Sequence, residues 1–453
     1  MKNWHKLVVA GLFAAAAGAA AAETVEATLE NGLKVVVRRD ARAPVAVSQL
    51  WYRVGSVDEV NGRTGLSHLL EHMMFKGTKT VPAGEFSRRI AAAGGQDNAF
   101  TSRDYTVYFQ QLAANRLPLS LTLESDRMAN LTIADDVFKK ELEVVKEERR
   151  WRTDDQPTGI LAETLYANAF VANPVRYPVI GWMDDIQNMK PDDLRAWYRE
   201  WYAPNNATLV VVGDVDPQAV IALARKEFEP LKSKTLAERR PQREPEQKGV
   251  RRVSVKAPSE LSYLTLAWQV PRLTRLAEAD PYALSMLTEL LDGHDAARLP
   301  RHLVREKKVA LSASSSYDPL GRGATLFTLT AVPANGADMG KLEAALKGEI
   351  ARIAQGGVSE VELARVRRQV EASRVFEKDS MFGQAMQIGS LESLGFSWRD
   401  EDEMNRRLLA VDAAAVKRAA QSLVDDKLTV VTLVAQPLKG RQVAPPANPK
   451  ELR

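Results

Sequence analysis

The sequence contains no cysteine, and only five of its 453 residues are histidine. The absence of cysteine excludes disulfides, so the fold must be held together by the burial of apolar side chains alone. The scarcity of histidine leaves little material for a Ser-His-Asp hydrolase, and no such order stands out. A phosphate loop is not present either, because the glycines of DPLGRGAT lack the lysine of that motif.

Long apolar runs are also missing, apart from one at the start of the chain. LVVAGLFAAAAGAA follows Lys2 and Lys6 and leads into small residues that match an A-x-A cleavage site. This pattern predicts a signal peptide over residues 1–22, cleaved after Ala22. No later stretch is long enough for a transmembrane helix. We therefore expect an exported, soluble protein of the periplasm with no membrane span, and an uncleaved membrane anchor is the alternative.

The two signs of charge are nearly balanced. The chain has 62 Lys and Arg against 58 Asp and Glu, and removal of the two leader lysines leaves 60 basic residues. Nucleic-acid-binding proteins gather basic residues on one face. This composition gives no reason to expect a nucleic-acid partner.

The length predicts at least two domains, and the strand and helix patterns occur twice in a similar order. Each half closes with an amphipathic helix and a short valine-rich strand: DDLRAWYREWY before NATLVVVGDVD, and AAAVKRAAQSL before LTVVTLVAQP. We expect an α+β fold of two structurally similar halves, each an antiparallel-rich sheet packed with helices. The predicted parts are an N-terminal domain (23–230), a linker (231–250), a C-terminal domain (251–438) and a disordered tail (439–453).

The stretch GLSHLLEHMMFKGT, residues 65–78, holds two histidines one helical turn apart. A helix from about Thr64 to before Gly77 would place His68, Glu71 and His72 on one face. The inward face would be Leu66, Leu69, Leu70 and Met73. Two imidazoles at this spacing can bind one metal ion, and the glutamate can reach the water of that ion. An ordinary helix with solvated histidines is the alternative.

A catalytic zinc site needs three protein ligands and one open position. His294 and His302 are poor candidates for the third ligand, because they lie in the second half near loop signals. The charged helix predicted from Asp135 to about Arg152 offers four carboxylates: Glu141, Glu143, Glu147 and Glu148. Spacing alone does not choose among them, and such a helix is more often a salt-bridged surface helix.

Four segments together are familiar: HLLEH, GGQDNAFTSRDYTVYF, ELEVVKEERR and YPVIGWMDDI. In this order and spacing they closely resemble the inverted-zincin peptidases of the pitrilysin, insulinase and mitochondrial processing peptidase family, over nearly the whole chain after the leader. The resemblance implies repeated α+β halves that enclose a chamber, and one Zn²⁺ per chain. The implied ligands are His68, His72 and Glu148, with Glu71 as the general base and Glu141 as a supporting glutamate.

The same resemblance implies how substrate binds. Asn98 and Ala99 match an edge strand with which such enzymes pair an extended peptide, a mode that uses backbone bonds and makes little demand on sequence. The expected function is that of a zinc-dependent endopeptidase acting on extended or unstructured peptides, with the zinc-bound water activated by Glu71.

One part of the family pattern is missing. Members bring an Arg…Tyr pair from a C-terminal half to the substrate, and in LVREKKVALSASSS Arg305 fits the arginine while Ser312 stands where the tyrosine would fall. Another residue, for instance Tyr317, would fill the role in one interpretation. In the other, the chain is the catalytic subunit of a heterodimer, and a related partner chain without the metal motif supplies the missing groups; a homodimer is less expected.

The number of halves favours the heterodimer, because this chain holds two where single-chain members carry four. A different class of function is a non-catalytic assembly or scaffold subunit of a peptidase-like complex. Such chains generally lose a ligand or the glutamate, whereas this one keeps all four positions.

Overall fold

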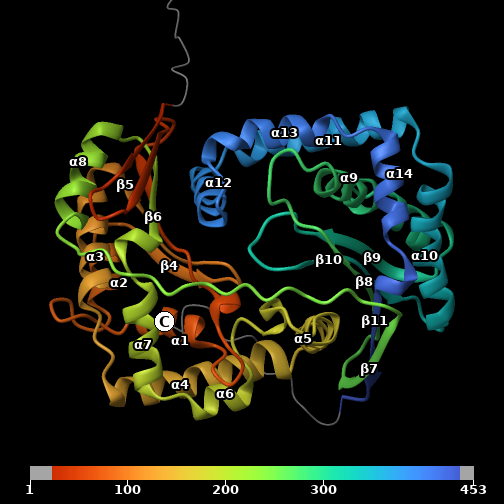
Figure 1. Ribbon diagram of the computed structural model, residues 1–453, viewed down its shortest axis with the longest axis horizontal. Helices are drawn as coiled ribbons and strands as arrows, with labels where there is room; N and C mark the ends of the chain where they lie inside the picture. Colours follow the sequence, from red (N-terminus) through yellow and green to blue (C-terminus); the bar gives the residue numbers. More distant parts are fainter. Residues whose placement is uncertain (1–22, 439–453) are drawn as a thin grey trace, which may run out of the picture.

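Two sheets, one in each half of the chain, organise the computed structural model, which describes residues 23–438 (Figure 1). The predicted signal peptide and the predicted disordered tail lie outside these residues. The expected fold class is confirmed: both sheets are mostly antiparallel, and both are packed with helices. Within residues 23–438, no helix combines the length and the apolar character needed to cross a membrane.

The first sheet has six strands in the order β1-β2-β6-β3-β5-β4. Its strands are β1 (Thr24–Thr28), β2 (Lys34–Arg39), β3 (Val45–Tyr52), β4 (Gln96–Thr101), β5 (Thr106–Ala113) and β6 (Ala207–Gly213). Only β2 and β6 pair in parallel. The strand β4 lies at an edge, so one side of its backbone is free for pairing.

The segment DNAFTSRDYTVYFQQL forms the hairpin β4–β5. The chain turns at Ser102, whose hydroxyl oxygen accepts hydrogen bonds of 3.1 Å from the N–H groups of Asp104 and Tyr105. A serine turn of this kind carries no glycine or proline signal. The turn leaves β4 paired on one side only.

Helices pack beside the first sheet, and all of them except α2 contribute buried side chains to its main core. They are α1 (Leu66–Met73), α2 (Glu85–Ala92), α3 (Leu117–Asn130), α4 (Asp135–Arg149), α6 (Met183–Asn188), α7 (Pro191–Trp201) and α8 (Pro217–Phe228). Successive strand residues face opposite sides, so Val35 and Val37 join this core while Val36 faces the other way.

The second sheet repeats the connectivity of the first, with the order β7-β11-β8-β10-β9. Its strands are β7 (Arg251–Pro258), β8 (Tyr263–Val270), β9 (Ala310–Tyr317), β10 (Thr325–Pro333) and β11 (Leu428–Gln436). Its helices are α9 (Asp280–Asp292), α10 (Met339–Gly356), α11 (Glu360–Glu377), α13 (Glu401–Leu409) and α14 (Ala413–Ser422). The parallel pair β7–β11 corresponds to β2–β6, and the edge strand β9 corresponds to β4.

Each half of the chain contributes one helix that packs on the sheet of the other half. The helix α12 (Met381–Leu394) packs Ala385 and Ile388 against Trp51 of the first sheet. In return, α5 (Pro157–Ala169) packs Leu161 and Leu165 on the second sheet. Figure 1 shows the blue α12 beside β6 and the yellow α5 beside β11. The exchange ties the two halves together through their cores.

Polar contacts also join the halves. The loop before β10 brings Arg322 to Asp58, where its two terminal nitrogens lie 2.8 and 2.7 Å from the carboxylate oxygens. The backbone N–H of Arg322 donates to Asp104 at 2.9 Å. Arg239 joins the same carboxylate at 2.9 Å from the segment 232–250, which contains no helix or strand. We propose that residues 231–250 are the linker.

Candidate metal centre and active site

The helix α1 is fixed at its start by backbone contacts that only glycine allows. Gly65 has φ +90°, and a Cβ there would lie 2.6 Å from the carbonyl oxygen of Ile180. The buried carboxylate of Glu59 accepts hydrogen bonds from the N–H groups of Gly65 (2.7 Å) and Ser67 (2.8 Å). These bonds satisfy amides that the first turn of a helix leaves without partners.

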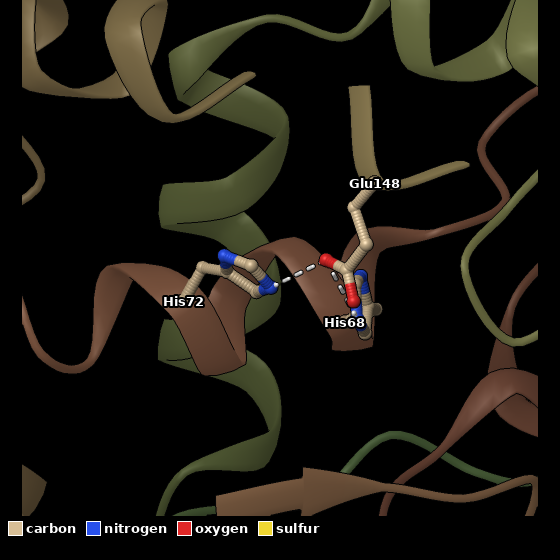
Figure 2. A group of neighbouring side chains, drawn as sticks. All are labelled: His68, His72 and Glu148. Atoms are coloured by element: carbon tan, nitrogen blue, oxygen red, sulfur yellow. Dashed lines mark ion pairs between the residues drawn. The ribbon is translucent and has the colours of Figure 1, made fainter. Parts of the chain in front are cut away.

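The two faces of α1 are those expected from the sequence. The predicted inward stripe is buried: Leu66, Leu69, Leu70 and Met73. The opposite face turns His68 and His72 toward Glu148 at the end of α4 (Figure 2).

Three donor atoms converge at this point. Oε2 of Glu148 lies 3.1 Å from Nε2 of His72 and 3.8 Å from Nε2 of His68, and the three groups lie within 4.8 Å of one another. Two donors bound about 2.1 Å from one tetrahedral ion would stand roughly 3.4 Å apart. The His₂Glu donor set and its spacing therefore fit a zinc ion, and no other such group occurs among residues 23–438.

The structure separates the four carboxylates of α4 that spacing could not. Glu148 reaches the two histidines, and Oε1 of Glu141 lies 2.9 Å from Nδ1 of His72. The other oxygen of Glu141 pairs with Lys76 at 2.7 Å. Glu143 and Glu147 point to solvent, and they pair with Lys146 of the same helix and with Arg150 just beyond its end. Glu141 therefore fixes the orientation of the His72 ring, as a carboxylate behind a metal-binding histidine does.

Burial and charge set the two histidines apart. Burial lowers the pKa of His68 to about 3, and the neighbouring His72 acts in the same direction. Burial also lowers the pKa of His72, but the hydrogen bonds with Glu141 and Glu148 outweigh it and raise that pKa to about 9. His68 is thus a neutral imidazole, the form that binds metal, while His72 must give up its proton to do so.

Glu71 lies on the same helix and is held from the sheet. Thr101, the last residue of β4, donates its hydroxyl to Oε2 of Glu71 at 2.5 Å. Within the described part of the chain, Oε1 of Glu71 accepts no hydrogen bond. Burial raises the pKa of Glu71, and the bond from Thr101 opposes this rise. A carboxyl with a raised pKa suits the transfer of a proton near neutral pH.

Comparison with known proteins identifies the family. Residues 34–181 match the family described as insulinase (peptidase family M16), and residues 188–370 match the peptidase M16 inactive domain. The chain is also 31% identical to a protease from Helicobacter pylori whose crystal structure it matches with a TM-score of 0.86, over 91% of this chain and 100% of that one. The chain belongs to peptidase family M16.

Two further proteins match this chain over different shares of their length. The zinc protease PqqE of Helicobacter pylori is 39% identical over 294 residues, which cover 64% of this chain and 65% of the relative. The fold also matches the periplasmic protease PqqL from Escherichia coli with a TM-score of 0.77 and 22% identity. That match covers 95% of this chain but only 49% of PqqL, so the longer protein contains the present fold within about half of its length.

The strand β4 places Asn98 and Ala99 on the free edge of the first sheet of this M16 chain. Asn98 is exposed, and its side-chain oxygen accepts a 2.9 Å hydrogen bond from the N–H of Ala99. This N–H is therefore bonded to the side chain before it rather than to β5. An incoming strand could take the place of the Asn98 side chain.

Within residues 23–438, no hydrogen bond or ion pair joins the residues of the expected Arg…Tyr pair to the metal ligands. Arg305 is exposed in the π-helical segment Pro300–Glu306, and among residues 23–438 no carboxylate lies within ion-pair distance of it. Ser312 is exposed on the edge strand β9. The hydroxyl of Tyr317 donates to the carbonyl oxygen of Pro271 at 2.6 Å, so it is already engaged within the second half.

Proposed function

We propose that this chain is a zinc-dependent endopeptidase that hydrolyses extended or unstructured peptides. The observation that carries the proposal is the convergence of His68, His72 and Glu148 beside Glu71, in a chain that belongs to peptidase family M16. His68, His72 and Glu148 would hold one Zn²⁺. When bound, zinc would polarise the peptide carbonyl and make water acidic enough to give up a proton near neutral pH.

The side chains of this protein have separate tasks in the reaction. Thr101 holds one oxygen of Glu71, so the other oxygen is left to take a proton from the attacking water. Glu71 then returns that proton to the leaving amine. Glu141 keeps the imidazole of His72 turned toward Glu148 throughout.

The edge strand β4 supports an extended substrate. A peptide that pairs with β4 gains backbone hydrogen bonds at Ala99, in place of the bond from the Asn98 side chain, and ends near Thr101, which touches Glu71. Because such pairing uses backbone groups, β4 can bind peptides of many different sequences in the same register. Most backbone groups of a folded protein are already paired, so an unstructured segment offers more of them to β4.

We also propose that the chain works as the catalytic subunit of a heterodimer with a related chain that lacks the metal motif. The match to only 49% of PqqL supports this, because that protein is long enough to hold a second fold of the same kind. The exposed Arg305 and Ser312 support it too, since no Arg…Tyr pair reaches the metal centre from the described part of this chain. The isolated chain is expected to bind zinc but to cleave peptides poorly.

Export to the periplasm completes the proposal. This part of the proposal rests on the leader predicted over residues 1–22. PqqL, which has the same fold and is described as periplasmic, supports it. Cell fractionation with the full-length chain, against a variant without residues 1–22, would test it.

The decisive experiment is cleavage of a quenched, unstructured peptide mixture by the purified chain, with and without candidate partner chains. Glu71→Gln keeps the three ligands and serves as the control. Turnover that disappears in this variant and zinc bound at one ion per chain would support the endopeptidase. A scaffold subunit of an M16 complex is the alternative, and it would assemble equally well with Glu71→Gln and show no turnover with any partner.

A further inference from the structure

A cavity of about 330 Å³ opens beside the metal centre. His68 and Thr101 form part of its wall, so it begins where the metal site and the strand β4 end. Three arginines and Tyr166 of α5 also line it: Arg103, Arg152 and Arg176. The chemical character of the wall is therefore basic.

Two of these arginines have only backbone and ring partners. Arg103 donates Nε to the carbonyl oxygen of Val175 at 3.3 Å, and its guanidinium lies 3.9 Å from the centre of the Tyr166 ring. Arg176 donates one terminal nitrogen to the carbonyl of Val171 at 2.7 Å, and its Nε is buried with no partner. Among residues 23–438, no carboxylate lies within 4.0 Å of either guanidinium.

The acidic groups near the cavity are already paired. Glu163 lines it, but its oxygens accept bonds of 2.7 and 3.0 Å from Arg149. The third arginine of the wall, Arg152, lies 2.8 Å from Oε1 of the proposed ligand Glu148. Arg103 and Arg176 thus bring positive charge to the wall without an ion pair to a carboxylate within the described residues, although Asp318 lies near enough to interact with Arg103.

We propose that this cavity is a specificity pocket for a carboxylate side chain, so that the enzyme prefers peptides with Asp or Glu beside the scissile bond. A peptide paired with β4 would pass the mouth of the cavity at Thr101, close to the metal ligand His68. A guanidinium with free nitrogens binds a carboxylate by charge-assisted and often paired hydrogen bonds. This inference rests on the proposed peptidase function and names the substrate class.

Paired peptides test the pocket. The peptides carry one Glu or one Gln, moved through the positions on both sides of the cleaved bond. kcat/KM is measured with the active enzyme, and Kd is measured by fluorescence anisotropy with the zinc-loaded Glu71→Gln variant, which does not cleave. At one position the Glu peptide is expected to be favoured about tenfold in both readouts.

Arginine variants locate the preference. Arg176→Gln should reduce it to about twofold or less, while Arg240→Gln should leave it unchanged, because Arg240 has the same charge but is 84% exposed in the linker and does not line the cavity. The preference of the unmodified enzyme should also shrink between about 0.05 and 0.5 M salt, a measurement that does not depend on whether Arg176→Gln folds.

The outcomes separate the two proposals. Equal kcat/KM and Kd for the Glu and Gln peptides at every position would overturn the pocket and leave the endopeptidase standing. A Glu preference that survives Arg176→Gln and high salt unchanged would also overturn the pocket. No cleavage and no binding of any peptide, alone or with a partner chain, would overturn the endopeptidase and the pocket together.

Discussion

The hydroxyl of Thr101 donates a hydrogen bond to Oε2 of Glu71 over 2.5 Å. One residue belongs to the edge strand β4 and the other to the helix of the metal motif, so the bond links the place where substrate would pair to the group that would move the proton. A carboxylate held at one oxygen presents the other in a fixed direction. The bond therefore positions the proposed general base.

Replacement of Thr101 tests this link. Thr101→Val keeps the side-chain shape but removes the donor, and a hydrogen bond to a charged group contributes about 1.5–3 kcal/mol. We expect kcat to fall about 10- to 100-fold, with KM and zinc content near those of the unmodified enzyme. Thr101→Ser restores the hydroxyl and should recover most of kcat. A change confined to KM would show instead that Thr101 acts only through the strand.

Replacement of Glu141 provides a second test, in which zinc affinity is measured without any catalytic assay. Glu141→Gln weakens the hold on the His72 ring, so we expect zinc to bind about 10- to 100-fold more weakly. Competition with a chromophoric chelator measures this without any substrate. Glu143→Gln is the matched control, because Glu143 lies on the same helix but is 66% exposed and, among residues 23–438, pairs with Lys146 alone. Equal zinc affinities for the two variants would show that Glu141 does not support metal binding.

The contrast between α1 and the exchanged helices α5 and α12 shows what the sequence could predict. The faces of α1 follow from spacing within one helix, so the apolar stripe and the pair His68 and His72 could be predicted from local periodicity. Nothing local reveals that α5 and α12 cross to the other half's sheet. Gly389 illustrates this, since a Cβ there would lie 2.0 Å from the indole of Trp51, a contact set by two residues far apart in sequence.

Other features were missed because their signals are weak. The strand β9 is serine-rich and exposed at half of its positions, so its composition resembles that of a loop. Thr101 joins the metal centre from β4, and no spacing rule connects it to Glu71. Lys76 and Arg152 lie four residues after His72 and Glu148, but that spacing alone does not show that Lys76 pairs with Glu141 of another helix. Glu148 itself was named from family resemblance, because four carboxylates of one helix were equivalent until the packing of α4 against α1 was known.

Glu59 gives the protein a specific dependence of stability on pH. Burial raises the pKa of Glu59 from 4.5 to about 7, although the N–H groups of Ser67 and Gly65 oppose the rise. Between these two values the folded state keeps a proton that the unfolded state has lost. The contribution of Glu59 to stability is therefore greatest below pH 4.5 and is lost as pH rises toward 7.

The comparison with Glu59→Gln isolates this group from the other titrating residues. The free energy of unfolding of the unmodified protein, minus that of the variant, should decrease from pH 5 to pH 8. Urea denaturation of both proteins without metal, at several pH values, measures the difference. An identical pH dependence of the two proteins would mean that Glu59 does not change its protonation on folding.

The contact between Arg322 and Asp58 should be the strongest single ion pair between the two halves. Only 11% of the Arg322 side chain and 3% of the Asp58 side chain are exposed, and the pair has two hydrogen bonds. Removal of one partner leaves a buried charge with fewer partners, so Arg322→Met should lower the free energy of unfolding by about 3 kcal/mol. Arg239 remains beside Asp58 and limits the loss.

Arg252→Met is the matched control for this pair. Arg252 makes two bonds of 2.8 Å to Glu343, the same number as Arg322 makes to Asp58, but its side chain is 57% exposed. Exposed pairs contribute about 1 kcal/mol or less, so denaturant titration should separate the two variants clearly. If both variants lost the same small amount, the halves would be held by the exchanged helices α5 and α12 rather than by the Arg322 contact. A large loss for Arg322→Met alone would mean that this charge pair adds to the exchanged helices in joining the two sheets.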